Sequence, residues 1–213
     1  TQLIAASGQP CPAGRYNDGS DALFFDGGCR VCPNNTYSSS PGGASQCTPC
    51  PQGTYTMDDG GAEWKHTICR PLCSIFPAWG SHHISSDCWM QDAVAVSGRL
   101  EVMGDKTDFP ILDAMSSRHF TVVAGGSLHL SHLVLGGGRV STSSCSGFTW
   151  QICLGGSIYV SSSTGRAFLN VTGVRIMDSA AYDGGGIYLS GSGASAWISR
   201  STIDGNSAGY RGG

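Results

Sequence analysis

One short motif recurs along the second half of the chain at a nearly constant interval. Copies read GGSLHLS from Gly125, GGSIYVS from Gly155 and GGGIYLS from Gly184, with a weaker SGRLEV from Ser97 and a last pair of glycines from Gly212. The interval between successive starts is about 28–30 residues, and a period of this length predicts a solenoid. In a solenoid, each repeat buries its apolar face against its neighbours.

Within each copy, apolar side chains alternate with polar or aromatic ones, which is the period-two pattern of a β-strand. We expect one set to point inward and stack coil upon coil: Leu100, Val102, Leu128, Leu130, Ile158, Val160, Ile187 and Leu189. We expect the other set to form one outward column, spaced about 4.8 Å apart: Glu101, His129, Tyr159 and Tyr188. His129, Tyr159 and Tyr188 are then candidates for a face that binds a glycan or a protein partner. The alternative is that the column only stabilises neighbouring strands.

Each repeat also contains further short apolar stretches, at residues 167–169, 174–176, 196–198 and 202–203. Three short strands per turn of about 29 residues predict a triangular β-helix. A leucine-rich repeat would need a Leu-x-x-Leu-x-Leu frame followed by Asn in every copy, and this half does not repeat one. Phe168 and Trp197 are expected to belong to the core.

Residues 92–213 resemble the pectin-lyase-like right-handed parallel β-helix. In particular, GGGIYLS from Gly184 and IDGNSAGYRGG from Ile203 resemble the Gly-Gly-x-Ile repeats of polymorphic outer-membrane proteins and related surface adhesins. The resemblance implies an all-β chain, and the motif interval predicts solenoid coils of about 28–30 residues.

Cysteines dominate the first part of the chain. Eight of the ten lie between Cys11 and Cys88, and a Cys-Pro-x-Gly/Asn-x-Tyr unit recurs at Cys11, Cys32 and Cys50. Pro restricts φ and Gly or Asn permits a left-handed residue, so each unit predicts a tight turn. Units this short need covalent staples. Residues 10–70 resemble the ephrin-receptor-like and tumour-necrosis-factor-receptor-like cysteine-rich repeats, which implies a secreted, rod-like, disulfide-rich module.

Two chemistries are open to these cysteines. The pairs Cys29-x2-Cys32 and Cys47-x2-Cys50 are spaced almost as in a zinc ribbon. The pattern continues to further cysteines on both sides, however, which favours disulfides. Spacing alone does not define the connectivity. We expect sequential pairs, with one local pair in the Ser/Thr-rich segment of the second half: Cys11–Cys29, Cys32–Cys47, Cys50–Cys69, Cys73–Cys88 and Cys145–Cys153.

These patterns divide the chain into four expected parts. Residues 1–10 form an N-terminal strand or arm, residues 11–72 form the cysteine-rich repeats, residues 73–91 form a junction or cap, and residues 92–213 form the β-helix. The apolar stretch at residues 3–6 is expected to offer a strand to a neighbouring molecule.

Composition and sequons predict an extracellular or cell-surface location. Ten cysteines suit an oxidising compartment, and Asn34 and Asn170 begin N-glycosylation sequons, so N-linked glycans are the only attached groups expected. The start, TQLIAASGQPC, lacks Met and a basic stretch, as expected after removal of a signal peptide. With a net charge of −3 and no basic run, the chain is not expected to bind nucleic acid. No apolar run reaches the roughly 18 residues of a membrane span.

Catalytic and metal sites are not expected. Polysaccharide-cleaving β-helices need clustered carboxylates with Arg or Lys beside them, and the candidates here are Asp178, Asp183 and Asp204 with Arg175, Arg200 and Arg211. The repeat aligns Asp178 with Asn206 and Asp183 with Arg211, which favours interchangeable turn residues. His66, His82 and His83 with Asp87 could bind a metal ion, but such residues more often form a polar loop.

We therefore expect a non-enzymatic structural or adhesive extracellular protein, such as a subunit of a cell-surface filament or matrix assembly. Its partners would be copies of itself, another extracellular protein or a glycan. The alternative is a carbohydrate-binding or polysaccharide-degrading β-helix whose active coils lie beyond this chain.

Overall fold

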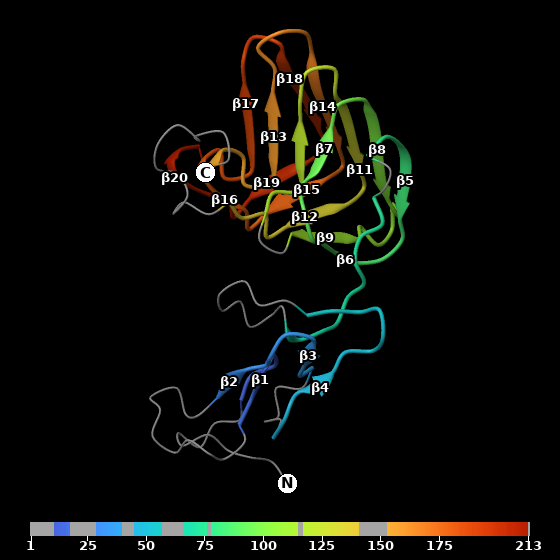
Figure 1. Ribbon diagram of the computed structural model, residues 1–213, viewed down its shortest axis with the longest axis vertical. Helices are drawn as coiled ribbons and strands as arrows, with labels where there is room; N and C mark the ends of the chain where they lie inside the picture. Colours follow the sequence, from blue (N-terminus) through green and yellow to red (C-terminus); the bar gives the residue numbers. More distant parts are fainter. Residues whose placement is uncertain are drawn as a thin grey trace. The chain divides into compact units, whose positions relative to one another are not determined.

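A computed structural model describes residues 11–17, 29–39, 45–56, 66–75, 78–114, 117–140 and 153–212. The chain divides into two compact units, Thr1–Leu72 and Cys73–Gly213 (Figure 1). All regular elements within the described residues are β-strands, which confirms the all-β prediction. The arm predicted for residues 1–10 lies outside these ranges. No helix in the described part of the chain is long and apolar enough to span a membrane.

The first unit contains two small antiparallel sheets. Strand β1 (Arg15–Tyr16) pairs with β2 (Arg30–Val31), and β3 (Thr36–Tyr37) pairs with β4 (Thr48–Pro49). Disulfides join Cys11 to Cys29, Cys32 to Cys47 and Cys50 to Cys69, and these are the pairs expected from the sequence. The unit is therefore crosslinked along its whole described length.

The repeated Cys-Pro unit forms the turn that its residues predict. The fourth residue of each copy is left-handed, with φ of 82° at Gly14, 62° at Asn35 and 80° at Gly53. In each copy the next backbone N–H donates to the Pro carbonyl, over 3.1 Å at Arg15, 3.1 Å at Thr36 and 3.0 Å at Thr54. Three turns of one geometry space the cysteines so that consecutive pairs meet.

The second unit is a parallel β-helix made of three main sheets. Sheet 1 contains β7 (Val94–Val96), β10 (Phe120–Val122), β13 (Ile158–Ser161) and β17 (Ile187–Ser190). Sheet 2 contains β5 (Gly80–Ile84), β8 (Arg99–Gly104), β11 (Ser127–Ser131), β14 (Ala167–Thr172) and β18 (Ala194–Ser199). Sheet 3 contains β6 (Cys88–Met90), β9 (Ile111–Ala114), β12 (Val134–Gly136), β15 (Arg175–Met177) and β19 (Thr202–Asp204).

Each full coil visits sheets 1, 2 and 3 in turn, so the prediction of three short strands per coil is confirmed (Figure 1). The last two coils add a fourth strand, and these two strands, β16 (Ala180–Asp183) and β20 (Ser207–Arg211), pair with each other. The predicted junction at residues 73–91 is part of this unit. It supplies β5 and β6, which pair with β8 and β9, and the Cys73–Cys88 disulfide.

The predicted stacking of the motif copies is wrong across the middle of the β-helix. Leu100 lies opposite Leu128 on sheet 2, as expected, but the next residue in that row is Leu169. Ile158 lies instead on sheet 1, opposite Phe120. The segment before Ile158 therefore lengthens one coil well beyond the repeat interval expected from the sequence, and the copies at Gly125 and Gly155 enter different sheets.

That lengthened coil contains the last pair of predicted disulfide cysteines. Cys153 is fully buried and disulfide-bonded. Its predicted partner, Cys145, lies outside the described residues.

The core consists of inward rows of aliphatic side chains. Leu100, Leu128 and Leu169 on sheet 2 are each 0% exposed. Ile158 and Val160 of sheet 1 are equally buried. Repeated coils with the same inward pattern thus produce one continuous apolar column, as the sequence predicts.

Candidate functional site

The outer face of sheet 2 carries a row of five side chains, one from each strand. In register order they are Ser81, Glu101, His129, Asn170 and Trp197, hereafter the outer row. Glu101, His129 and Asn170 are each flanked by buried core residues on their own strands, so strand alternation directs them away from the core. Ser81 and Trp197 share this face through the register. His129, a candidate partner-binding residue from the sequence, lies at the centre of this row.

The His129 ring is held by its neighbours on the same face. Its Nε2 lies 2.9 Å from Ser127 Oγ, two residues earlier on β11. Its Nδ1 lies 3.4 Å from Asn170 Nδ2 on β14. Because an amide nitrogen can only donate, Nδ1 is the acceptor, and Nε2 carries the hydrogen that Ser127 Oγ accepts. Partial burial and the nearby Arg99 lower the pKa of His129, so its neutral form is favoured.

Aromatic side chains surround Asn170 on this face. Phe168, two residues earlier on β14, meets the His129 ring edge-on with 6.0 Å between ring centroids. Trp197 lies directly opposite Asn170 on β18 and is 66% exposed. The prediction that Trp197 belongs to the core is wrong, because the register places it on the outer face.

The predicted column of His129, Tyr159 and Tyr188 does not exist as one face. His129 belongs to sheet 2, whereas Tyr159 and Tyr188 pair on sheet 1. Tyr159 is also only 6% exposed, because Arg118 lies over its ring at 5.1 Å and Tyr188 stacks on it at 6.2 Å. It is a packed side chain rather than an exposed platform. Sequence reasoning missed this because both sheets carry the same local motif.

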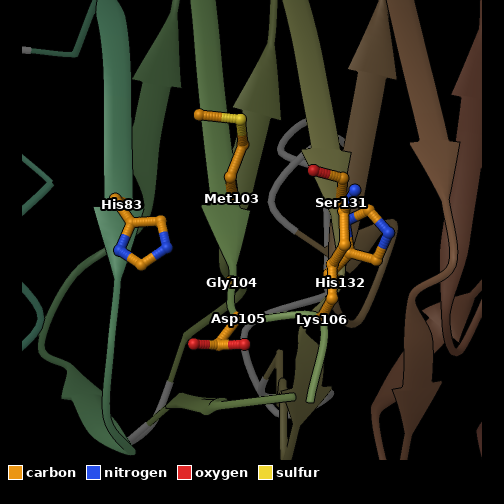
Figure 2. A pocket seen from close by; sticks show the side chains of 7 residues that line it. All are labelled: His83, Met103, Gly104, Asp105, Lys106, Ser131 and His132. Carbon is orange, nitrogen blue, oxygen red and sulfur yellow. The ribbon is translucent and has the colours of Figure 1, made fainter. Parts of the chain in front are cut away.

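A hollow of about 510 Å3 opens where β5, β8 and β11 end. It is lined by His83, Met103, Gly104, Asp105, Lys106, Ser131 and His132 (Figure 2). The Asp105 carboxylate accepts hydrogen bonds from Thr107 N at 2.9 Å and Thr107 Oγ1 at 2.8 Å, and these lower its pKa. The His132 ring lies close to Gly173 in the next coil. It points away from His83 (Figure 2). Asp105 therefore binds Thr107 beside the hollow, and His132 is directed toward the next coil.

The candidate acids make contacts between coils. Asp204 Oδ2 binds Arg175 Nη2 at 2.7 Å, one coil away, and this pairing lowers the pKa of Asp204 and raises that of Arg175. Asp183 lies opposite Arg211, as the repeat predicts. Asp178 has a φ of 54° at the corner after β15, and its counterpart is Gly205 rather than the predicted Asn206, because Met177 pairs with Asp204.

No group of three or more His, Cys, Asp or Glu side chains that could hold a metal ion occurs in the part of the chain that the structure describes. His66 lies buried in the first unit, whereas His82 and His83 lie on β5 of the second. The three histidines proposed from the sequence as a metal alternative are thus divided between the two units.

The two sequons occupy different local structures. Asn34 is exposed in the turn between β2 and β3, where Thr36 Oγ1 donates to the Pro33 carbonyl at 2.7 Å. Asn170 is half-buried in the middle of β14, which pairs with β11 on one side and β18 on the other. The same three-residue code is therefore presented by a turn in one unit and by a central strand in the other.

Comparison with known proteins bears on the first unit. No curated protein and no solved structure matches the chain. Residues 24–65 match the family described as tyrosine-protein kinase ephrin type A/B receptor-like. Together with the consecutive disulfides, this match identifies an ephrin-receptor-like cysteine-rich segment, and it is consistent with an extracellular protein.

Proposed function

We propose that the chain is a non-enzymatic structural or adhesive component of an extracellular assembly, and that the apolar rows exposed on strands β17, β18 and β19 accept further β-structure. The resemblance of GGGIYLS and its neighbours to adhesin repeats supports this role, as does the cysteine-rich module. The observation that carries the proposal is the exposure of core-type side chains on these three strands.

Strands β17, β18 and β19 present inward rows that the previous coil buries. Leu189 is 41% exposed, although its partner Val160 on the previous coil is 0% exposed. Ile198 is 44% exposed opposite a fully buried Val171. Ile203 on sheet 3 is 43% exposed opposite a fully buried Ile176. An apolar end with open strand edges on three sheets is a template for further β-structure.

The other end of the β-helix is covered. Ile84 on β5 is 6% exposed, Met90 on β6 is 3% exposed and Val94 on β7 is 7% exposed. Ile75 joins the same core cluster, and the Cys73–Cys88 disulfide ties its segment to β6. The first coil therefore buries core-type side chains of the kind that β17, β18 and β19 expose.

The polar residues considered for catalysis have a structural role in this proposal. The Arg175–Asp204 ion pair links neighbouring coils at an exposed position. Asp183 forms a parallel β-bridge with Leu154 on one side and pairs with Arg211 on the other. We propose that these residues align the coils, and that the chain uses no cofactor or metal and carries N-linked glycans as its modification.

Sedimentation velocity of residues 1–213 across a range of protein concentrations tests whether these rows accept further β-structure, with a second copy as the probe. We expect self-association that Ile198→Asp abolishes, because the charge would enter the apolar contact. Ser195→Asp is the matched control, since Ser195 lies on the outer face of the same strand. A wild-type chain that stays monomeric at high concentration, or equal effects of the two variants, would refute this interface.

A further inference from the structure

We propose that Asn170 carries an N-linked glycan whose first sugar packs on Trp197, so that the glycan becomes part of the outer face of sheet 2. This inference rests on the proposed extracellular function, because the chain must pass through the secretory pathway to receive such a glycan. It goes further in assigning a structural partner to the glycan.

The register brings the two residues together. Asn170 begins the sequon Asn170-Val171-Thr172 and belongs to the outer row, with Trp197 directly opposite it on β18. Neighbouring strands lie about 4.8 Å apart, so the two side chains leave the sheet side by side. Both point away from the core, since Val171 and Leu169 on either side of Asn170 are 0% exposed.

The contact between Asn170 and His129 is compatible with attachment of a sugar. An unmodified amide has two N–H groups, and Nδ2 uses one of them toward His129 Nδ1 at 3.4 Å. Transfer from a lipid-diphosphate-linked oligosaccharide forms a bond from Nδ2 to the sugar C1 atom. The C1–O bond to the diphosphate breaks, the lipid diphosphate leaves, and Nδ2 loses one proton. One N–H remains, and it can still donate to His129.

The first sugar of the glycan would cover the exposed ring of Trp197. Trp197 is 66% exposed, the joint highest value among the large apolar side chains in the described residues. Packing of an aromatic ring against the apolar face of a neighbouring group is stabilising, and a pyranose ring presents such a face. Phe168, on the same face two residues before Asn170, borders the site from the other side of the row through its edge contact with His129.

The position of Asn170 in a paired strand also determines whether glycosylation comes before or after folding. Asn170 is half-buried between β11 and β18, and Thr172 Oγ1 lies 3.1 Å from Ser199 Oγ of the next coil. A sequon held in a paired strand is not accessible to an enzyme that must bind it as a free segment. Modification of Asn170 must therefore precede pairing of β14 with β18, whereas the exposed turn at Asn34 stays accessible.

Peptide mass spectrometry and thermal melts of the secreted chain test the proposal. The chain is produced in a eukaryotic secretory host and, as an unglycosylated reference, in a bacterial periplasm. We expect glycan mass on the Asn170 peptide. We expect Trp197→Ala to lower the melting temperature more in the glycosylated protein than in the reference, by roughly 2–4 °C. Tyr210→Ala is the control, because Tyr210 is 63% exposed on β20 and is not in register with either sequon.

The possible results distinguish failure of the glycan, failure of its contact with Trp197 and failure of the proposed extracellular function. An unmodified Asn170 peptide in a protein whose Asn34 is glycosylated would overturn it and leave the extracellular function standing. A glycosylated Asn170 with equal Trp197→Ala effects in the two preparations would overturn the packing contact. If neither sequon is modified and the cysteines are reduced in the protein isolated from its own cells, the proposed extracellular function itself fails. A Thr172→Val variant, which removes the sequon and keeps Asn170, should lose the extra effect of Trp197→Ala.

Discussion

The two units of this chain stabilise their folds by different means. Among the described residues of the first unit, the buried apolar side chains are the cystines Cys11 and Cys32, accompanied by polar residues such as Thr56 and His66. The second unit buries continuous rows of Leu, Ile and Val. The first unit therefore depends on covalent crosslinks, and the second depends on repeated stacking.

This difference follows from how much surface each repeat can bury. A cysteine-rich repeat of about 20 residues is too small to enclose an apolar core, so disulfides limit the entropy of its unfolded chain instead. A β-helix coil is little larger, but each coil covers the next, and burial accumulates along the stack. A coil without a covering neighbour exposes its core-type side chains, and Leu189 and Ile198 are exposed in this way within the described residues.

Reduction of the disulfides should produce the largest difference in stability between the two units. Each bond in the first unit closes a loop of 15 to 19 residues and contributes roughly 3 kcal/mol. We expect the amides of residues 11–72 to lose protection in hydrogen exchange when a phosphine reductant is added, while the strands from β8 to β15 keep theirs. Simultaneous loss of protection in both units would contradict the comparison.

A charge placed on one core row should distinguish an inner coil from the last coil. Val160 and Leu189 are partners on sheet 1, but Val160 is 0% exposed and Leu189 is 41% exposed. Val160→Lys loses about 1.5–3 kcal/mol of apolar burial before the cost of burying the charge. We expect Leu189→Lys to cost much less in urea denaturation. Equal losses would mean that Leu189 is covered in the native protein.

Alanine substitutions at Gly156 and Gly98 should show how closely neighbouring coils approach each other at each position. A Cβ on Gly156 would overlap the Gly185 carbonyl oxygen and lie 2.8 Å from Ala180 N, both in rigid backbone. Gly156→Ala should therefore destabilise the β-helix by about 1–3 kcal/mol. Gly98→Ala is the control, because its Cβ would meet nothing within 4 Å, and it should be neutral or slightly stabilising. Urea midpoints of the two variants give the comparison.

The smallest expected effect is the contribution of His129, on the outer face of the β-helix, to the pH dependence of stability. The folded state lowers the pKa of His129, chiefly through partial burial, so the unfolded chain takes up this proton first as the pH falls. The resulting stability is complete above the unfolded pKa of about 6.5 and decreases as the pH drops through it. His129→Gln should remove that part of the pH dependence. An NMR titration giving His129 a pKa above the unfolded value would reverse the sign.

Local chemistry made several features predictable. The Cys-Pro-x-Gly/Asn-x-Tyr unit encodes its turn directly, because only a left-handed residue fits its fourth position, and Gly14, Asn35 and Gly53 all adopt it. Alternation of apolar residues correctly marks Leu128 and Ile158 as core. Both signals depend on near neighbours in the chain, so they can be identified before the fold is known.

The outer-face site could be predicted only in part. His129 was identified from strand alternation, but its partners Asn170 and Trp197 lie on the next two strands of sheet 2, far along the chain. The repeat interval indicated Tyr159 and Tyr188 as its companions instead. The extra length before β13 breaks that periodicity, and no local signal shows which sheet the next copy of the motif enters.

The sequence by itself therefore determined that the chain forms disulfide-bonded turns followed by stacked coils of β-strands, because these follow from Gly, Pro and Cys positions and from period-two alternation. Only the tertiary structure decided which strands lie side by side and which faces they share. The physical reason is that sheets 1 and 2 use the same local motif, since GGSIYVS enters sheet 1 and GGSLHLS enters sheet 2. Their local codes are equivalent, and hydrogen bonding between distant strands selects the register.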